Sequence, residues 1–502
     1  MTTSVDAPAE RAPLPPVALR PVAAVAAVLT VVLTALSGRY GFHRDELYFI
    51  AAGKHPDWGY VDQPPLTPML ARLSTSLFGE TPYGLRVVST VACALMVVVA
   101  ALIARELGGG RPQQLFTAIA TAVSGFVLAV GHMLSTTTFD LLLWLVLIWI
   151  ALRVLRGGDG RWWLAAGAVA GVGVLNKYLV GLLVFALLAG ILLTGRRDVL
   201  RGRGLLAGIA VAALIAAPNL VWQAAHDWPQ LTVAGGISAD DGTENRVMFA
   251  PLQLLYLSPV LVPVWVAGLV RLWRAPELRW AKAVAVAYPV MFAVTLIGGG
   301  KSYYVLPILL ALTAAGAAPV LAWAAARPAR KAALAVGAVV AAASSAVISL
   351  PVLPPSALGP VIAVNAEQGE QVGWRELTET VADAWNALPS TAGAVILTQN
   401  YGQAGAISLH GPELGLPEPY SGHMSFADWG PPPEDADGAV LLVTQDGEGH
   451  ADIERHFAGC RLSAVFDNGF GVDNEEQGAW LWECARTVRP WSQTWPELRH
   501  FY

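Results

Sequence analysis

The chain has 502 residues, of which 55% are hydrophobic and only 14% are charged. Average soluble domains carry about 25% charged residues, so this composition excludes an ordinary soluble protein and favours one embedded in a membrane. The formal net charge is -5, and no basic domain indicates a nucleic-acid partner.

The N-terminal residues 1–17 are rich in Pro and Ala, and we predict a disordered cytoplasmic segment there. The first apolar run, Val22 to Leu36, is not followed by a small-residue cleavage site, so it is predicted to be a retained span. A spanning helix needs roughly 20 apolar residues, and residues 18–351 contain about eleven such segments. They are predicted at 18–38, 84–103, 114–131, 138–155, 162–178, 179–195, 204–221, 251–270, 280–297, 303–322 and 332–351.

Lys and Arg concentrate in alternate loops between the predicted spans, and short loops of this kind face the cytoplasm. These basic loops carry Arg105 and Arg111; Arg153, Arg156 and Arg161; Arg196, Arg197, Arg201 and Arg203; Arg271, Arg274, Arg279 and Lys282; and Arg327, Arg330 and Lys331. The pattern predicts a multi-pass protein of the cell membrane with a cytoplasmic N-terminus. It places on the outer face the first loop, residues 132–138, 222–250 and 298–302, and everything after about residue 352.

The composition changes at Pro351–Pro355. Beyond it, Gly393–Thr398 and Gly438–Thr444 are short β-rich runs separated by Asp, Glu, Gly and Pro, as expected of strands. A segment of this size is long enough for its own small core. We therefore predict an all-α membrane domain over residues 18–351 and an extracytoplasmic α/β domain over residues 352–502.

The chain has only three cysteines, too few for a disulfide scaffold or a multi-thiolate metal site. Cys460 and Cys484 both lie in the domain placed outside, where disulfides persist, so they are predicted to form a bond. Cys93 lies within a span and is predicted to be free.

The first outer loop concentrates charge in a chain that is otherwise poor in it. The adjacent acids Asp45 and Glu46 lie just beyond a span and can supply a general base near a membrane-bound substrate. The alternative is a solvated loop with ordinary charges. Downstream, Asp62 and Gln63 precede a Pro-Pro pair that fixes the chain direction. This turn favours a shaped loop, which we interpret as half of an active site.

Asp140 opens an apolar helix directly after a run of Ser and Thr. Its simplest role is to cap that helix or to interact with the helix dipole. An acid at a membrane boundary is also a functional candidate, and the predicted topology places Asp140 on the same face as Asp45.

Two lysines, Lys177 and Lys301, are also placed on the outer face. Either can simply extend its ammonium to the membrane interface. Gly298–Gly300 gives Lys301 a flexible turn that allows a phosphate to approach. His226 and Asp227 begin the 222–250 loop, where one such pair is weak evidence for metal or acid–base chemistry. The lysines and acids together favour a lipid phosphate beside a reacting hydroxyl.

The order of these motifs resembles a known family. It comprises the Asp45-Glu46 pair, the Asp62-Gln63-Pro64-Pro65 turn, Asp140, the Asn176-Lys177-Tyr178 segment, and Lys301 to Pro307 with its two tyrosines. Over about residues 20–350, the chain resembles the bacterial protein O-mannosyltransferases and aminoarabinose transferases of glycosyltransferase family 39, which have the GT-C fold. Asn400 to His423 resembles the outer domain of actinobacterial-type members.

The resemblance implies an inverting transferase that takes a sugar from a polyprenyl phosphate at the outer membrane face. It implies catalytic roles for Asp45, Glu46 and Asp140. It implies substrate binding by His43, Arg44, Tyr48, Tyr60, Asp62, Gln63, Lys177, Tyr178, His226, Lys301, Tyr303 and Tyr304. Relatives often carry Glu-Lys where this chain has Asp62-Gln63, so donor or acceptor preference is expected to differ.

Two other functions fit an all-helical membrane chain. A transporter or flippase also carries intramembrane charges, but here they collect at the outer boundaries and no repeat is visible. A membrane-anchored binding protein would need far fewer spans. The sequence leaves open which sugar is moved, whether the acceptor is a protein, a glycan or a lipid, and whether a divalent metal takes part.

Overall fold

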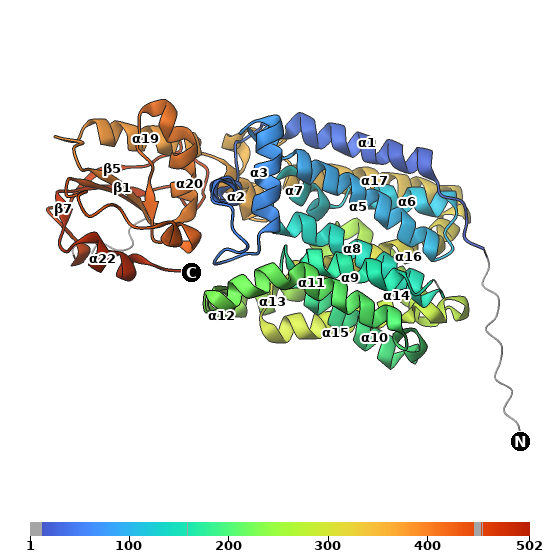
Figure 1. The fold of residues 1–502 in the computed structure, drawn as a ribbon. Helices are drawn as coiled ribbons and strands as arrows, with labels where there is room; N and C mark the ends of the chain where they lie inside the picture. Colours follow the sequence, from blue (N-terminus) through green and yellow to red (C-terminus); the bar gives the residue numbers. More distant parts are fainter. Residues whose placement is uncertain (1–12, 158, 446–452, 454, 502) are drawn as a thin grey trace, which may run out of the picture.

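The computed structural model describes residues 13–157, 159–445, 453 and 455–501. A helical bundle occupies one end of the molecule and a smaller α/β unit the other, with α2 lying where the two meet (Figure 1). This is the predicted fold class, an all-α membrane part followed by a C-terminal part with a sheet.

The bundle is built from α-helices connected by short loops. They are α1 (Leu19–Leu36), α2 (Arg44–Lys54), α3 (Leu66–Phe78), α4 (Pro82–Leu85), α5 (Val87–Glu106), α6 (Arg111–Ala122), α7 (Gly125–His132), α8 (Thr136–Leu155), α9 (Trp162–Val174), α10 (Val180–Leu193), α11 (Arg203–Ala225), α12 (Pro229–Asp240), α13 (Gly242–Leu255), α14 (Val262–Arg274), α15 (Lys282–Gly298), α16 (Leu306–Ala325) and α17 (Pro328–Ser349). Short 3₁₀ segments join some of them: η1 (Arg197–Leu200), η2 (Pro259–Leu261), η3 (Pro276–Ala281) and η4 (Ser302–Val305).

The predicted spans coincide with these helices. Within the described residues, 7 helices are long and apolar enough to cross a membrane, or up to 9 if two bent pairs each count as one span. The bent pairs are α6 with α7, at 58°, and α13 with the segment Pro259–Arg274, at 75°. The remaining predicted spans, 162–178 and 179–195, correspond to the shorter apolar helices α9 and α10.

Small residues let the bundle helices approach closely, as is common where helices pack inside a membrane. A Cβ on Gly268 of α14 would lie only 1.8 Å from the carbonyl oxygen of Leu312 in α16. A Cβ on Gly316 would lie 1.9 Å from the carbonyl oxygen of Val264. No larger residue fits at either position, so the spacing of α14 and α16 depends on these glycines.

The segments predicted to share the outer face do meet at one end of the bundle. The backbone N–H of Leu134 donates to Glu46, which joins the 132–138 turn to the first loop. Lys301 pairs with Asp241, which joins residues 298–302 to the 222–250 loop. Basic loops meet at the other end, where Arg153 pairs with Glu106 at 2.8 Å. The grouping of the loops is therefore confirmed, and the direction in which each face points stays a prediction.

A topology reporter tests that direction. A reporter that is active only outside the cytoplasm is expected to work when fused after Tyr502, because the basic loops hold the opposite end of the bundle in the cytoplasm. The same reporter inserted between Arg196 and Arg203 is the control and is expected to be silent. Activity at the second position alone would place the acids of the first loop in the wrong compartment for this account.

The C-terminal part begins with short helical segments and then forms the sheet. Its helical elements are η5 (Pro355–Ala357), α18 (Gly359–Ile362), η6 (Ala366–Gln371), α19 (Trp374–Asn386), α20 (Tyr401–His410), η7 (Gly411–Leu414), η8 (Met424–Trp429) and α22 (Trp491–Leu498). Its strands are β1 (Val395–Thr398), β2 (Tyr420–Ser421), β3 (Val440–Thr444), β4 (Phe457–Ala458), β5 (Arg461–Val465), β6 (Trp480–Cys484) and β7 (Arg486–Thr487).

The main sheet has the strand order β2-β1-β3-β6-β5. β1 pairs in parallel with β2 and β3, whereas β6 is antiparallel to β3 and β5. The two runs predicted as strands contain β1 and β3, whose side chains are all buried, as expected for strands covered on both faces. On the bundle side, a Cβ on Gly405 of α20 would lie 2.9 Å from the backbone of Leu47 in α2, so the two helices touch directly.

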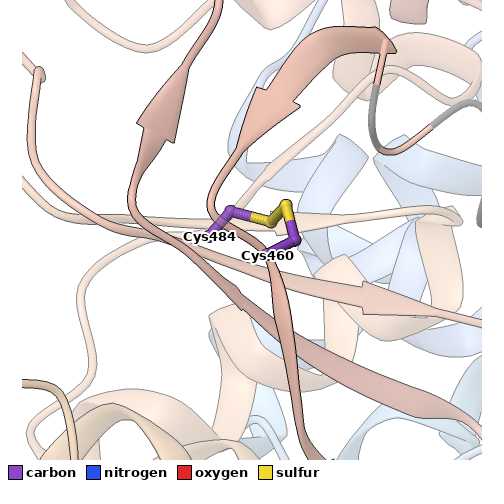
Figure 2. The surroundings of a disulfide bond; sticks show 2 residues. All are labelled: Cys460 and Cys484. Carbon is purple, nitrogen blue, oxygen red and sulfur yellow. A yellow bond between two sulfur atoms is a disulfide. The ribbon is translucent and has the colours of Figure 1, made fainter.

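The predicted disulfide is present. Cys460 and Cys484 are bonded, with their Cα atoms 3.9 Å apart, and join the segment before β5 to the end of β6 (Figure 2). Cys93 is buried and free, as predicted for a cysteine within a span.

The N-terminal prediction needs a correction. The carbonyl of Pro15 accepts a hydrogen bond from Arg105 at 2.7 Å, and that of Pro16 accepts one from Gln114 at 3.1 Å. The residues just before α1 are thus ordered against the basic end of the bundle, where the sequence predicted disorder. Residues 1–12 lie outside the described part of the chain.

Candidate active site

The first turn of α2 separates the two adjacent acids of the first loop. His43 is the N-cap: its Nδ1 accepts from the backbone N–H of Asp45, and its own N–H donates to Glu46 at 2.8 Å. This reciprocal pair is a capping box, which fixes the start of the helix. The side chain of Asp45 is 36% exposed, whereas that of Glu46 is 0% exposed.

Glu46 is fully occupied by structural contacts. Arg86 donates to both carboxylate oxygens, at 2.9 and 2.6 Å, and Leu134 donates its N–H at 2.8 Å. Both side chains of this ion pair are 0% exposed. The pair joins the first loop to α5 and to the turn before α8. This geometry argues against the catalytic role that the sequence suggested for Glu46.

Asp45 is held by the C-terminal part of the chain. The hydroxyl of Tyr401, the first residue of α20, donates to Oδ1 of Asp45 at 2.8 Å. Burial and the negative charge of Asp45 raise the pKa of Tyr401 well above its usual value, so the hydroxyl stays protonated and donates. Arg44 approaches the same oxygen at 3.8 Å and forms an ion pair with Glu475. The tail therefore supplies part of the surroundings of this carboxylate.

A second acid, Asp62, lies in the same group. The hydroxyl of Tyr48 donates to Asp62 at 2.6 Å, and the ring of Tyr48 lies 5.0 Å from that of Tyr401. Partial burial raises the pKa of Asp62 to about 6; the charge of Asp45 also raises it, while the Tyr48 hydrogen bond and Lys177 lower it. Two carboxylates and a lysine thus influence one another in this part of the structure.

Asp140 is tied to the same region through Asn176. The amide of Asn176 donates to Asp140 at 2.8 Å, and its oxygen accepts from Thr67 near the start of α3, at 2.8 Å. The N-cap of α8 is Ser135, whose hydroxyl accepts from Thr138, so Asp140 is not the capping residue. Asp140 is buried one turn into the helix, and it is available for a role other than capping.

Lys177 follows Asn176 and lies beside two tyrosines. Its ammonium nitrogen is 5.9 Å from the centre of the Tyr303 ring and 5.8 Å from that of Tyr304. These are cation–π distances, and they hold the ammonium near Asn176 and Asp140. Acid, amide, cation and aromatic rings therefore gather around one region at the end of the bundle.

Comparison with known proteins identifies the fold. The sequence profile described as dolichyl-phosphate-mannose-protein mannosyltransferase matches residues 62–222. ArnT from Cupriavidus metallidurans bound to undecaprenyl phosphate has a similar structure, with a TM-score of 0.60 and 16% identity over 92% of this chain and 97% of that chain. Its apo state matches over the same shares with a TM-score of 0.54 and 15% identity. Among curated proteins, no match to this sequence was found.

The chain has the GT-C glycosyltransferase fold. The resemblance predicted from the motif order is confirmed by the profile and by the structural likeness. The profile begins at Asp62 and ends at Trp222, so it includes Asp140 and Lys177 but not Asp45.

Other predicted site residues of the GT-C domain lie at its edges. Lys301 forms an ion pair with Asp241, between α12 and α13. Tyr178 donates to Asn219 at 2.5 Å, and the ring of His226 stacks on Trp222 at 4.0 Å. These contacts join the residues before α10 to α11, and the loop after α15 to the segment between α12 and α13. The ammonium of Lys301 is therefore engaged in an ion pair within the protein.

The turn that follows α2 contains two more predicted residues. The hydroxyl of Tyr60 donates to the carbonyls of Ala52 and His55, at 2.9 and 3.0 Å, which closes the turn. The side chain of Gln63 is 3% exposed, and neither its amide nitrogen nor its oxygen has a hydrogen-bond partner among the described residues. Gln63 is the position at which relatives often carry Lys.

Sequence reasoning missed residues that complete this site. Arg86 is a charged residue at the edge of an apolar span, a signal that can identify a buried ion pair. Tyr401 donates to Asp45, and the hydroxyl of Ser425 accepts from the backbone N–H of Val61 at 3.1 Å. Neither residue carries such a signal, because these contacts arise only when the tail packs on the first loop and α2. Within the described residues, no group of three or more His, Cys, Asp or Glu is placed to hold a metal ion.

The acids near the tail predict a pH dependence of stability. Burial raises the pKa of Glu370 to about 7; Arg44 lowers it and Glu475 raises it. The pKa of Glu370 is near 4.5 in the unfolded chain and about 7 in the folded protein, so the folded state holds its proton more tightly. The free energy of unfolding therefore falls as the pH rises from about 4.5 through about 7. Glu370→Gln is therefore expected to lose less stability than the wild type between pH 5 and pH 8, in thermal unfolding of the detergent-solubilised protein. An identical pH dependence in both proteins would refute this interpretation.

Proposed function

We propose that the protein is a membrane glycosyltransferase that moves a sugar from a polyprenyl-phosphate donor to an acceptor hydroxyl at the outer membrane face, with inversion. The GT-C fold supports a glycosyltransferase, and the similar ArnT structure contains undecaprenyl phosphate. The observation that carries the proposal is the partly exposed carboxylate of Asp45, held by Tyr401, whose ring packs against the tyrosine that donates to Asp62. This geometry suits a base that receives a proton from an acceptor.

Asp45 acts as the general base in this proposal. Within the described residues, the contacts from Tyr401 and Arg44 both reach Oδ1, which leaves Oδ2 for an acceptor hydroxyl. As the acceptor oxygen attacks the anomeric carbon, its proton passes to Asp45. The new bond forms on the face opposite the breaking bond between the anomeric carbon and the phosphate oxygen. The attack therefore inverts the anomeric configuration.

The leaving polyprenyl phosphate needs a positive group nearby. Lys177 lies above the Tyr303 and Tyr304 rings, beside the residue that orients Asp140. A fixed ammonium at this place stabilises the negative charge that develops on the phosphate. We assign Lys177 to this role and Asp140 to holding the sugar. We assign Glu46 a structural role, because it forms a buried ion pair with Arg86. Lys301 is also assigned a structural role, because its ammonium pairs with Asp241.

Tyr401 is proposed as a positioning residue that acts through Asp45. Tyr401→Phe keeps the ring packed against Tyr48 but removes the hydrogen bond to the carboxylate. A hydrogen bond to a charged group contributes about 1.5 kcal/mol or more, so kcat is expected to fall about tenfold or more while KM for the donor changes little. Tyr420→Phe, at a tyrosine in β2, is the matched control. Equal kcat values for Tyr401→Phe and the wild type would exclude this role.

The donor class can be tested in cells. Removing the protein is expected to cause its polyprenyl-phosphate sugar to accumulate in the membrane, because the transfer that consumes the sugar is lost. Mass spectrometry of extracted lipids measures this directly. Wild-type protein should restore the normal level, and Asp45→Asn should not. If no polyprenyl-phosphate sugar increases, the protein does not consume this class of donor.

A further inference from the structure

A cavity of about 620 Å³ lies between the bundle and the tail. Three parts of the chain form its walls: the loop that follows α2, the end of α11, and η8. The volume lies within the range of about 300–1,000 Å³ that is typical of sites for small ligands. Its charged and aromatic lining residues include Lys54, His55, Asp57, Trp222, His226, Asp428 and Trp429.

The walls of this cavity are fixed by close contacts. Asn219 donates to the carbonyl of Trp58 at 2.7 Å, which holds the loop against α11. A Cβ on Gly59 would lie 2.4 Å from a ring atom of Trp222, so only glycine fits there. These contacts fix the loop against α11, so the two walls cannot move closer together and fill the cavity. The cavity is therefore preformed.

Stacked rings form two sides of the cavity. The imidazole of His55 lies parallel to the indole of Trp429, with centroids 4.2 Å apart and an angle of 14°. Trp222 and His226 make a similar pair at 4.0 Å and 15°. Rings of this size offer broad apolar surfaces with polar edges. The apolar C–H face of a sugar ring fits against such a surface.

Carboxylates complete the lining. Asp57 and Asp428 both border the cavity, and ionised carboxylates accept hydrogen bonds from hydroxyl groups. Asp428 also pairs with Arg499 on the tail, which holds it in place. Lys54 at the edge of the cavity pairs with Glu80, and Asp428 pairs with Arg499, so the lining has no large excess of charge of one sign that would favour an ionic ligand. The charged groups also disfavour a hydrocarbon chain. A neutral ring with many hydroxyls matches both the aromatic and the acidic parts of the lining.

Ser425 connects this cavity to the acids of the proposed site. It lines the cavity, its hydroxyl accepts from the backbone N–H of Val61 at 3.1 Å, and its own N–H donates to Tyr48 at 3.4 Å. Tyr48 in turn donates to Asp62. A sugar in the cavity therefore lies beside the group of residues that contains Asp62 and Asp45.

We propose that this cavity binds a sugar ring of the acceptor, and that the acceptor is a glycan. The inference rests on the proposed function, which it deepens by naming the acceptor class. The aromatic rings of the lining can contact the C–H face of a sugar ring, and its carboxylates can accept hydrogen bonds from the sugar hydroxyls. A protein or a simple lipid acceptor would present no such ring to the cavity.

The acceptor class can be tested with the purified full-length protein and radiolabelled polyprenyl-phosphate sugar. The acceptors are three fractions of the cell envelope: delipidated glycan, protein, and extracted lipid. Label is expected in the glycan. Label in the protein or the lipid fraction, with donor consumed, would overturn the glycan proposal but keep the transferase. No consumption of donor with any fraction would refute the proposed function and the inference together.

Variants of the lining test the cavity itself. Trp429→Ala removes one stacking ring, and Asp57→Asn removes a charge but keeps the oxygen that accepts from Trp58. Each is expected to raise the glycan concentration for half-maximal transfer about tenfold, since one stacking contact or charged hydrogen bond is lost. Half-saturation by the donor should stay near the wild-type value. Trp323→Ala, at an exposed tryptophan of α16, is the control. Unchanged glycan half-saturation in Asp57→Asn, which should keep its fold, would overturn the proposal.

Discussion

Asp45→Asn is expected to lower transfer by about a thousandfold while the protein remains folded and inserted, since a general base contributes 10²–10⁴-fold. The asparagine oxygen can still accept from Tyr401, so the contact between the tail and α2 is kept. The amide, however, cannot take up the proton of the acceptor hydroxyl. The measurement is the initial rate of sugar transfer by purified protein, with thermal unfolding as the check on folding.

Glu379→Gln is the matched control for this variant. Glu379 is an exposed acid of α19 and pairs with Arg375 at 3.2 Å. Its neutralisation removes the same charge without touching Asp45 or the lining of the proposed acceptor cavity, so transfer should stay near the wild-type rate. Full turnover by a folded Asp45→Asn protein would remove Asp45 from catalysis.

Arg86→Ala is expected to be among the most destabilising single changes in the chain. It leaves the carboxylate of Glu46 without its partner in a place where both side chains are 0% exposed. Breaking a buried ion pair in this way costs about 3–5 kcal/mol. Thermal unfolding in detergent should show a large fall in the transition temperature, and expression in the membrane should fall with it.

Two comparisons make this prediction specific. Lys54→Ala breaks the exposed pair with Glu80 and should cost less than about 1 kcal/mol. The double variant Glu46→Gln with Arg86→Met removes both buried charges and should recover part of the stability lost in Arg86→Ala. If Arg86→Ala and Lys54→Ala unfold at the same temperature, the buried pair is not the anchor of the first loop.

Much of the bundle could be predicted from the sequence because its signals are local. Runs of apolar residues predict spans, and the spacing of Lys and Arg predicts which loops share a face. The structure brings the 132–138 turn against the first loop, as expected, through the contact of Leu134 with Glu46. The bend of 75° after α13 falls at Pro259, a residue type that interrupts helices, whereas the apolar run alone predicted one continuous span.

The candidate site could be predicted only in part. Asp45 and Glu46 are adjacent in the sequence, but the capping box of His43 turns one outward and buries the other. Histidine is an unusual capping residue, so the pattern did not reveal the motif. The contact between Tyr401 and Asp45 joins residues 356 positions apart. Such contacts depend on tertiary packing, and no local pattern in the sequence contains them.

The pairing of Lys301 shows another limit of sequence reasoning. Its flexible glycine turn predicted a phosphate site, whereas the structure pairs it with Asp241 from the 222–250 loop. That loop contains α12 and part of α13, so an acid within it can reach the end of α15. Charges that the sequence places on one face can therefore neutralise one another instead of meeting a ligand.

The most direct test of this account is transfer of labelled sugar from polyprenyl phosphate to the pooled glycan, protein and lipid fractions of the cell envelope, by the purified protein in detergent and without a sealed membrane. A glycosyltransferase requires no compartments, so the wild type is expected to release polyprenyl phosphate and to form a glycoside of inverted anomeric configuration. Asp45→Asn is expected to form both products about a thousandfold more slowly. If the wild type leaves the lipid-linked sugar intact in detergent but moves it across the bilayer of a reconstituted vesicle, the protein is a flippase and the account is contradicted.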